Sequence, residues 1–371
     1  MRAALVFLCV MLPLFDRPAS SGTQQLSPES LARHTIERRA AQTSAPVPVT
    51  LDNFVRAESD LYMGNALKEA GATGKFFHHR EPVQIDKQFV IRPNRDTLYS
   101  TAVFDLDAGP VVITMPEAGR RFMSMQVINQ DHYVQDVFYG AGARTLTKDK
   151  IGTRYIIVAV RTLVDPNDPN DVAEVHKLQD AIKVSQKSPG IFEVPDWDQA
   201  EQKKIRDALL GLAAFTDGFR NAFGAKGQVD PVRHLIGTAA GWGGNPDKDA
   251  IYLSVTPAKN DGATTYKLNV KSVPVDAFWS VSVYDAHGYF EKNQYGAYTI
   301  NNITGKKSVD GTIAIQFGGC DGKIPNCLPV MKGWNYTVRL YRPRAEILNG
   351  EWTFPQPQAV SELATSSRRK S

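Results

Sequence analysis

Runs of alternating hydrophobic and polar residues recur along this chain and predict a fold made mainly of β-strands. They cover 101–106, 111–115, 121–128, 154–162, 251–255, 264–270, 278–284, 311–317 and 334–341. Alternation indicates strands, because successive side chains of a strand point to opposite faces of the sheet. Turn pairs such as Asp261-Gly262 and Asp310-Gly311 separate the runs. Many short strands divided by turns predict sandwich- or jelly-roll-like halves rather than a parallel sheet.

Apolar residues at helical spacing predict helices before and between these strands. The first helix begins after the N-cap residue Asp52, ends at Gly71, and places Phe54, Ala57, Leu61, Tyr62 and Leu67 at helical spacing. Two further helices, one around 172–182 and one over 199–223, are expected between the two β-rich halves. The predicted fold class is therefore mainly β with helical insertions (α+β).

The chain length of 371 residues predicts two domains, and 42% hydrophobic with 22% charged residues suits a globular protein. The composition and the periodic runs divide it into a signal peptide (1–21), a flexible leader (22–49), an N-terminal β-rich domain (50–165), a helical connector (166–229), a C-terminal β-sandwich domain (230–360) and a flexible tail (361–371).

The first residues predict export. Arg2 supplies a positive charge, residues 3–15 form an apolar run, and small residues follow at 19–22. This run is too short to span a bilayer but suits a signal peptide cleaved near Ser21, although a buried first strand is an alternative. No later apolar run reaches transmembrane length, so we expect a periplasmic or secreted protein without stable membrane insertion.

Charge and motifs exclude several function classes. The 43 basic and 39 acidic residues give a net charge of +4 and are spread through the chain, so no nucleic-acid partner is predicted.

The sequence also lacks clear cofactor motifs. The Gly-rich passage 237–244 has no phosphate-loop lysine or dinucleotide motif, and no cofactor is evident. The aspartates within 165–171 are spaced as calcium ligands can be, but turn residues with an N-cap before a helix are the stronger interpretation. No His-x-x-x-His motif supports a metal at His78-His79, so no metal site is predicted. A Gly-x-Ser-x-Gly elbow is absent. The sequence makes no prediction of oligomeric state.

Cys320 and Cys327 are expected to pair. They lie seven positions apart around Asp321-Gly322 and Pro325, where a disulfide can close a short loop in an oxidising compartment. Free thiols are the next alternative. A metal site would need ligands from elsewhere in the chain, because this spacing does not form a zinc knuckle.

The candidate catalytic groups are Glu58, Asp96 and His132. Glu58 lies on the first predicted helix and Asp96 precedes a strand, so the fold would have to bring them together as an acid–base pair. His132 follows Asp131 at a strand end and is the best general-base candidate. A histidine in an exposed loop without a catalytic role is the alternative.

The candidate ligand-binding residues combine charged, amide and aromatic groups: Arg56, Tyr62, Asn94, Arg95, Tyr99, Trp279 and Tyr284. The segment 94–99 can bind a polar ligand through charge-assisted hydrogen bonds, with the first helix across from it. Alternatively, it can fix the start of the following strand to the rest of the fold. The aromatic residues of the second half can fill a core or form a platform for a sugar or another ring-bearing ligand.

Two parts of the chain resemble domains of unknown function. The stretches 52–60 (DNFVRAESD) and 94–106 (NRDTLYSTAVFDL) resemble the domain of unknown function 1254. The stretch 276–285 (DAFWSVSVYD), with Asn293, Asp310-Gly311, Leu328-Pro329 and Arg339-Leu340-Tyr341, resembles the domain of unknown function 1214. The resemblance covers most of the mature chain in the usual order. It implies two β-rich, jelly-roll-like halves with helical insertions, in a mostly bacterial family without an established reaction.

The chain departs from that family pattern at one place. Asn326-Cys327 stands where the family pattern looks like Asn-Trp. The exchange of an aromatic residue for a cysteine favours a local disulfide and removes any ring-mediated ligand contact at this position.

Two functions from different classes are consistent with these features. The first is an exported, hydrolase-like enzyme that acts on a small polar or glycan-like substrate. The second is a non-catalytic periplasmic ligand-binding or envelope interaction protein. An enzyme should bring titratable groups together in one cleft, whereas a binding protein should line a cleft with aromatic and hydrogen-bonding groups.

Overall fold

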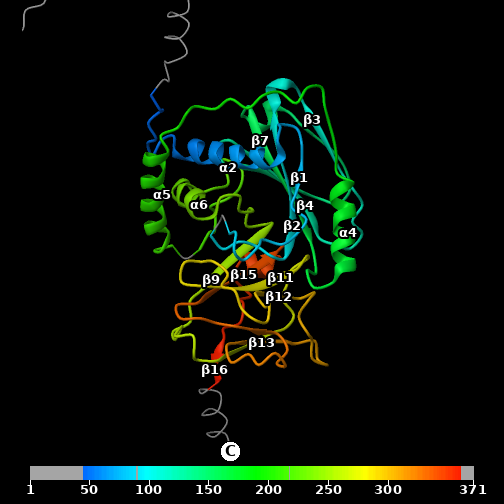
Figure 1. The fold of residues 1–371 in the computed structure, drawn as a ribbon, viewed down its shortest axis with the longest axis vertical. Coiled ribbons are helices and arrows are strands. Elements are labelled where there is room, and N and C mark those ends of the chain that lie inside the picture. The colour runs from blue at the N-terminus through cyan, green and yellow to red at the C-terminus, as the bar shows by residue number, and fades with distance from the viewer. Residues whose placement is uncertain (1–44, 89–90, 217, 361–371) are drawn as a thin grey trace, which may run out of the picture. The chain divides into compact units, whose positions relative to one another are not determined.

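The computed structural model describes residues 45–88, 91–216 and 218–360 (Figure 1). The predicted signal peptide, most of the predicted leader and the predicted tail lie outside these ranges. Mainly antiparallel sheets with intervening helices make up the described part of the chain, as the sequence predicted. None of its helices is both long and apolar enough to cross a membrane.

The first half contains two antiparallel sheets. The larger has the order β1 (Phe77–His78), β2 (Thr97–Asp105), β7 (Tyr155–Leu163), β4 (Met123–Asn129) and β5 (Val134–Tyr139). The smaller has the order β6 (Gly142–Leu146), β3 (Val111–Met115) and β8 (Lys183–Gln186). β8 lies in the segment predicted as a helical connector, yet it pairs with β3 of the first half.

The larger sheet is buried on both faces. On one face Ile156, Val158 and Val160 of β7 join a core with β3 and β6. On the other face Tyr155 and Ile157 pack with residues of α2 (Phe54–Ala70). Arg161 follows on the α2 side of the same strand, because side chains alternate between faces.

The second half is a sandwich of two four-stranded sheets. One has the order β12 (Thr299–Asn301), β11 (Trp279–Tyr284), β15 (Asn335–Tyr341) and β9 (Ala250–Val255). The other has the order β14 (Cys327–Leu328), β13 (Ile313–Phe317), β10 (Tyr266–Val270) and β16 (Gln358–Ala359). Their facing apolar side chains form one core, which includes the predicted ligand residue Trp279.

The opposite face of the first sandwich sheet is polar but buried. It carries Ser280, Ser282 and Tyr284 of β11, which alternate with the core residues of that strand, and Arg339 of β15. A buried polar face requires hydrogen-bonding partners, since an unsatisfied buried polar group is costly. This face receives some of them from the segment 92–93 of the first half.

The predicted disulfide is present. Cys320 and Cys327 are joined with an S–S distance of 2.03 Å and a Cα–Cα distance of 5.7 Å. Cys327 begins the short edge strand β14. The bridge therefore closes the loop that connects β13 with β14.

The helices differ in part from the prediction. α4 (Pro169–Asp180) is capped by the Asp168 side chain, and α5 (Gln199–Ala213) is shorter than the predicted helix over 199–223. The Thr216 hydroxyl donates to the Ala213 carbonyl. This bond satisfies the carbonyl within a turn, so it does not need a further helical hydrogen bond. The residues after α5 are therefore free to form a loop.

α6 (Pro231–Gly241) was not predicted and extends into the Gly-rich passage. A Cβ atom at Gly244 would lie 2.2 Å from the Phe223 ring, so this close packing requires glycine. α5 and α6 lie beside α2 (Figure 1). The three helices therefore cover the region where Arg161 emerges from the sheet.

The described structure contains two short helices besides these. They are α3 (Lys148–Ile151) and α7 (Ala345–Leu348), with a 3₁₀ turn at Leu106–Ala108.

Candidate functional site

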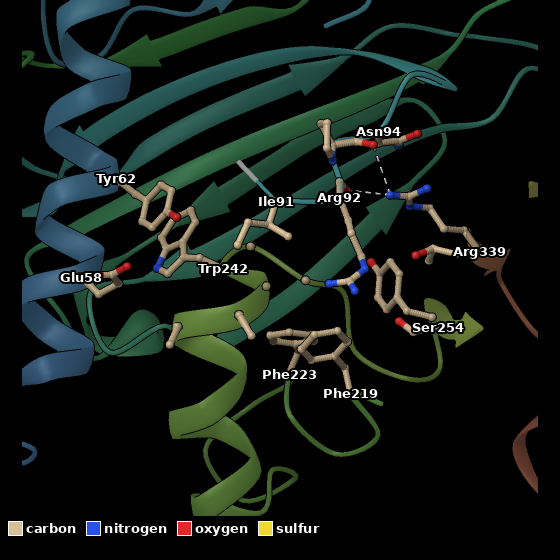
Figure 2. A pocket seen from close by; sticks show the side chains of 18 of the residues that line it. Glu58, Tyr62, Ile91, Arg92, Asn94, Phe219, Phe223, Trp242, Ser254 and Arg339 are labelled. Atoms are coloured by element: carbon tan, nitrogen blue, oxygen red, sulfur yellow. Dashed lines mark hydrogen bonds between the residues drawn. The ribbon is translucent and has the colours of Figure 1, made fainter. Parts of the chain in front are cut away.

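A cavity of about 430 Å³ lies where the two halves and the helices meet, a usual size for a small-molecule site. Its walls come from α2, α5 and the loop after it, the end of α6, the segment 91–94, and strands β2, β7, β9 and β15. Figure 2 shows the Arg92 side chain reaching into it, with Tyr62 and Trp242 on one side and Ser254 and Arg339 on the other.

The wall carries more positive than negative groups. Four arginines line the cavity: Arg92, Arg161, Arg206 and Arg339. Glu58 is the one acidic residue among the lining residues that the structure describes. It is fully buried and accepts two hydrogen bonds from Arg206, of 2.7 and 2.6 Å, and one of 2.7 Å from Gln202. This ion pair offsets one cation and leaves three.

Arg161 is 7% exposed and is held by neutral acceptors. It donates to the Gln126 side chain, to the Gly243 carbonyl at 2.8 Å and to Asn245 Oδ1 at 3.4 Å. Its guanidinium also lies over the Tyr99 ring, 5.3 Å from the ring centroid. In the described part of the chain no carboxylate forms an ion pair with it.

Arg339 is also buried, at 3% exposure. It donates to Ser282 Oγ at 3.0 Å, to the phenol oxygen of Tyr284 at 2.8 Å and to the Arg92 carbonyl at 2.8 Å. No described carboxylate lies within ion-pair distance of it, so its partners, like those of Arg161, are neutral oxygens.

Among the described residues, none forms a hydrogen bond or an ion pair with the Arg92 side chain. Its backbone has a positive φ of 52°, and its amide donates to the Gly288 carbonyl at 2.8 Å. Its side-chain Nε is buried without a hydrogen-bond partner among the described residues. Burial lowers the pKa of Arg92, and the neighbouring charge of Arg339 lowers it further. An anion between these two side chains would relieve both effects.

Three phenols add hydrogen-bond donors to the wall. Asn94 Nδ2 donates to the oxygens of Tyr99 and Tyr341, and Asn245 donates to that of Tyr252. Within the described ranges none of these phenols donates to a protein acceptor, and the buried hydroxyl of Thr337 has no partner. The wall is therefore rich in donors and short of acceptors.

The Tyr99 phenol is electrostatically unusual. Burial by itself raises the pKa of Tyr99, but the adjacent Arg161 charge and hydrogen bonding outweigh burial and lower that pKa. Tyr99 and Arg161 lie opposite each other in the β2–β7 register, which fixes this proximity. The phenol is thus a better hydrogen-bond donor to a bound oxyanion than an isolated tyrosine.

The opposite part of the cavity is aromatic. Tyr62 stacks on Trp242 with ring centroids 4.5 Å apart, and Phe219 and Phe223 from the loop after α5 complete this wall. Figure 2 shows Phe219 and Phe223 at the end of the Arg92 side chain, with Tyr62 and Trp242 farther to the left. One cavity therefore combines donors and cations with an apolar surface.

His132 supports this wall from behind. It is fully buried, and its ring stacks on Trp242 at 5.1 Å. The Gly243 amide donates to Nε2, while Nδ1 lies 2.8 Å from the Thr238 hydroxyl, which itself donates to the His234 carbonyl. These contacts place the ring proton on Nδ1. Burial, together with His234, lowers the pKa of His132 well below its usual value, so the ring is neutral.

The structure brings four of the predicted site residues to the cavity: Glu58, Tyr62, Asn94 and Tyr99. Six others do not line it. Arg56 pairs with Asp131, and His132 lies behind Trp242. Trp279 is in the sandwich core, and Tyr284 contacts the cavity residue Arg339 from outside the lining. Arg95 and Asp96, the remaining two, lie beside the lining residue Asn94.

Arg95 and Asp96 connect the two halves instead. Arg95 donates to the Val83 carbonyl, and its guanidinium lies 5.1 Å from the Tyr298 ring centroid. Asp96 is 1% exposed and accepts from Thr299 at 3.2 Å and Asn301 at 3.1 Å, both on β12. Within the segment 94–99, the end residues Asn94 and Tyr99 line the cavity. Arg95 and Asp96 between them hold the start of β2 against the second half.

Sequence reasoning missed the three arginines that have no ion pair. Arg161 and Arg339 had a recognisable signal, since each is a charged residue inside a strand whose neighbours are all buried. A charge in such a position needs a partner or a function. Arg92 had no comparable signal, because it lies in an irregular segment between elements.

Comparisons with known proteins agree with this fold. Residues 73–150 match "Protein of unknown function (DUF1254)" and residues 251–345 match "Protein of unknown function (DUF1214)". No match was found among curated proteins.

Two solved structures are similar in fold. The VPA0106 protein from Vibrio parahaemolyticus has a TM-score of 0.62 and 17% identity, over 82% of this chain and 96% of that one. A putative uncharacterized protein from Burkholderia cenocepacia has a TM-score of 0.50 and 14% identity, over 91% of each chain. At such identities the likeness concerns the fold alone. The family matches, in this order, show that the chain is one that carries a DUF1254 region followed by a DUF1214 region.

Proposed function

We propose that this protein binds a small organic anion in the cavity. The observation that carries the proposal is the set of three guanidinium groups, those of Arg92, Arg161 and Arg339, which line one cavity without an ion-pair partner among the described residues. A buried charge without a counter-charge costs several kcal/mol. A bound oxyanion would supply the missing charge and accept the unused hydrogen bonds.

The proposal takes the binding alternative rather than the hydrolase-like one. Glu58 is the acidic group at the wall, and its oxygens are occupied by Arg206 and Gln202. Asp96 and His132 are buried outside the lining. Hydrolysis of a small polar or glycan-like substrate stays a prediction, and incubation of the protein with p-nitrophenyl acetate, p-nitrophenyl phosphate and a p-nitrophenyl glycoside tests it.

Replacing Arg92 gives the sharpest test of anion binding. Its side chain donates to no described residue, so Arg92→Gln should fold as the wild type does. We expect acetate and sulfate, titrated calorimetrically at constant ionic strength, to bind the wild type and to bind Arg92→Gln about tenfold more weakly. This is the usual scale for one charge-assisted hydrogen bond.

Arg344→Gln is the matched control, because Arg344 is exposed and pairs with Asp276 away from the cavity. Its anion affinity should equal that of the wild type. The proposal fails if the wild type binds neither anion, or if Arg92→Gln binds both as tightly as the wild type does.

We also propose that the protein is exported and acts in the periplasm or outside the cell. The disulfide supports this, because structural disulfides persist in oxidising compartments. N-terminal sequencing of protein from its native host should find a chain that begins near Gly22. Recovery of a chain that begins at Met1 would contradict export with cleavage.

A further inference from the structure

The cavity has two chemically different ends, and this bears on the class of anion that it accepts. At one end Arg339, Ser254 and Thr337 project from the polar face of a sandwich sheet. At the other end stand Tyr62, Trp242, Phe219 and Phe223. Arg92 extends between them (Figure 2). A ligand that fills the cavity therefore contacts cations and aromatic rings at the same time.

We infer that the bound anion is a small aromatic acid, with its oxyanion group beside Arg92 and Arg339 and its ring against the aromatic wall. This inference rests on the proposed function and names the ligand class of the same site. It goes beyond charge, since an inorganic ion would satisfy the arginines equally well.

Size favours an organic body over an inorganic ion. A cavity of about 430 Å³ falls in the range of sites that enclose a whole organic molecule. An inorganic oxyanion has the dimensions of a few water molecules, each about 30 Å³ in the liquid. The aromatic end of the cavity would then stay filled with water, and its apolar surface would contribute nothing to the free energy of binding.

The aromatic wall is also preorganised. Trp242 stacks with both Tyr62 and His132, with centroid distances of 4.5 and 5.1 Å. Phe223 contacts His132 at 5.8 Å and is held closely by Gly244. Rings fixed in this way lose little freedom when a ligand packs on them, and a ring in the ligand can use edge-to-face contacts with them.

Matched probes separate the contributions of charge and ring. Phenylacetate carries both, acetate only the charge, phenylacetamide only the ring, and hexanoate has a flexible chain in place of the ring. Phenyl phosphate and inorganic phosphate form the same comparison for a phosphate head group. We expect phenylacetate to bind the wild type at least about tenfold more tightly than acetate, phenylacetamide or hexanoate.

The outcomes distinguish this inference from the proposed function. Equal affinity within both pairs, acetate with phenylacetate and inorganic phosphate with phenyl phosphate, overturns the aromatic-acid inference while anion binding stands. Where phenylacetate binds more tightly than acetate, equally tight binding of hexanoate also overturns it. Tight binding of phenylacetamide would overturn the role of the oxyanion. Failure of every anion to bind overturns both. If only the phosphate pair shows the difference, the head group is a phosphate and the ring inference holds.

Phe219 provides the corresponding variant. Phe219→Ala should weaken phenylacetate binding about five- to tenfold and leave acetate binding unchanged, because it removes ring surface without altering charge. Phe219→Leu keeps most of the side-chain volume but removes the ring, so it should also weaken phenylacetate binding if contacts with the ring contribute. Phe215→Ala is the control, since Phe215 is 89% exposed and does not line the cavity. Equal phenylacetate affinity in all three variants would contradict the inference.

Discussion

Replacing Glu58 with alanine is expected to lower the free energy of unfolding by about 3–5 kcal/mol. The carboxylate is fully buried, and it raises the pKa of Arg206 by hydrogen bonding to it. Removing it leaves a partly buried guanidinium and the Gln202 amide without their acceptor. Urea unfolding of the wild type and the variant measures the difference.

Two comparisons make the Glu58 result specific. Glu58→Gln keeps the shape and one acceptor oxygen, so it should lose about half as much stability. Glu174→Ala breaks an exposed pair with Lys177 and should change stability by less than about 0.5 kcal/mol. Loss of the counter-charge should also free Arg206 to attract anions, so Glu58→Gln should bind acetate more tightly. A loss below about 1 kcal/mol in Glu58→Ala would contradict a structural role for this pair.

His132→Ala is expected to destabilise the fold by about 3–4 kcal/mol. The change opens a cavity between the rings of Trp242 and His234 and leaves the Gly243 amide without its acceptor. It should also weaken anion binding, because the Gly243 carbonyl is one of the groups that orient Arg161. Thermal melts and acetate titration of the variant measure the two effects.

The same histidine predicts a pH dependence. Since burial lowers its pKa in the folded protein, below about pH 6.5 the unfolded chain binds a proton that folded His132 does not. This contribution therefore makes the folded state less stable as the pH falls below about 6.5, and the slope should be smaller in His132→Ala. His287→Ala, at an exposed site, should keep the wild-type slope and stability. An unchanged slope in His132→Ala would count against a buried neutral imidazole.

Much of the fold was predictable because burial repeats along strands and helices. The run at 154–162 has the alternation of a strand, and β7 indeed directs Ile156, Val158 and Val160 to one core and Tyr155 and Ile157 to another. The cysteine pair was predictable because its spacing is short and its ends lie in adjacent strands or loops. Such signals depend on neighbours in the sequence.

Other elements were missed where that periodicity is interrupted. β5 was not predicted, and its pairing with β4 contains a register shift at Val127/Ile128 that breaks the two-residue repeat. The helix over 199–223 was predicted too long, since apolar residues at 215, 219 and 223 continue the helical spacing although the chain turns at Thr216. The apolar side chains of Phe219 and Phe223 line the cavity instead of packing along one face of a helix.

The candidate site shows the same division. The sequence by itself indicated that Glu58, Tyr62, Asn94 and Tyr99 were candidates, because charged and hydrogen-bonding side chains cluster near the first helix and a strand entrance. It also determined the β-rich fold and the two family regions.

Only the tertiary structure decided that Arg92, Arg161 and Arg339 meet at the cavity while Asp96 and His132 do not line it. These arginines come from segments up to 247 residues apart, as the contact between Arg92 and Arg339 shows. Whether such charges converge depends on how sheets and helices pack across that distance, and no local periodicity encodes it.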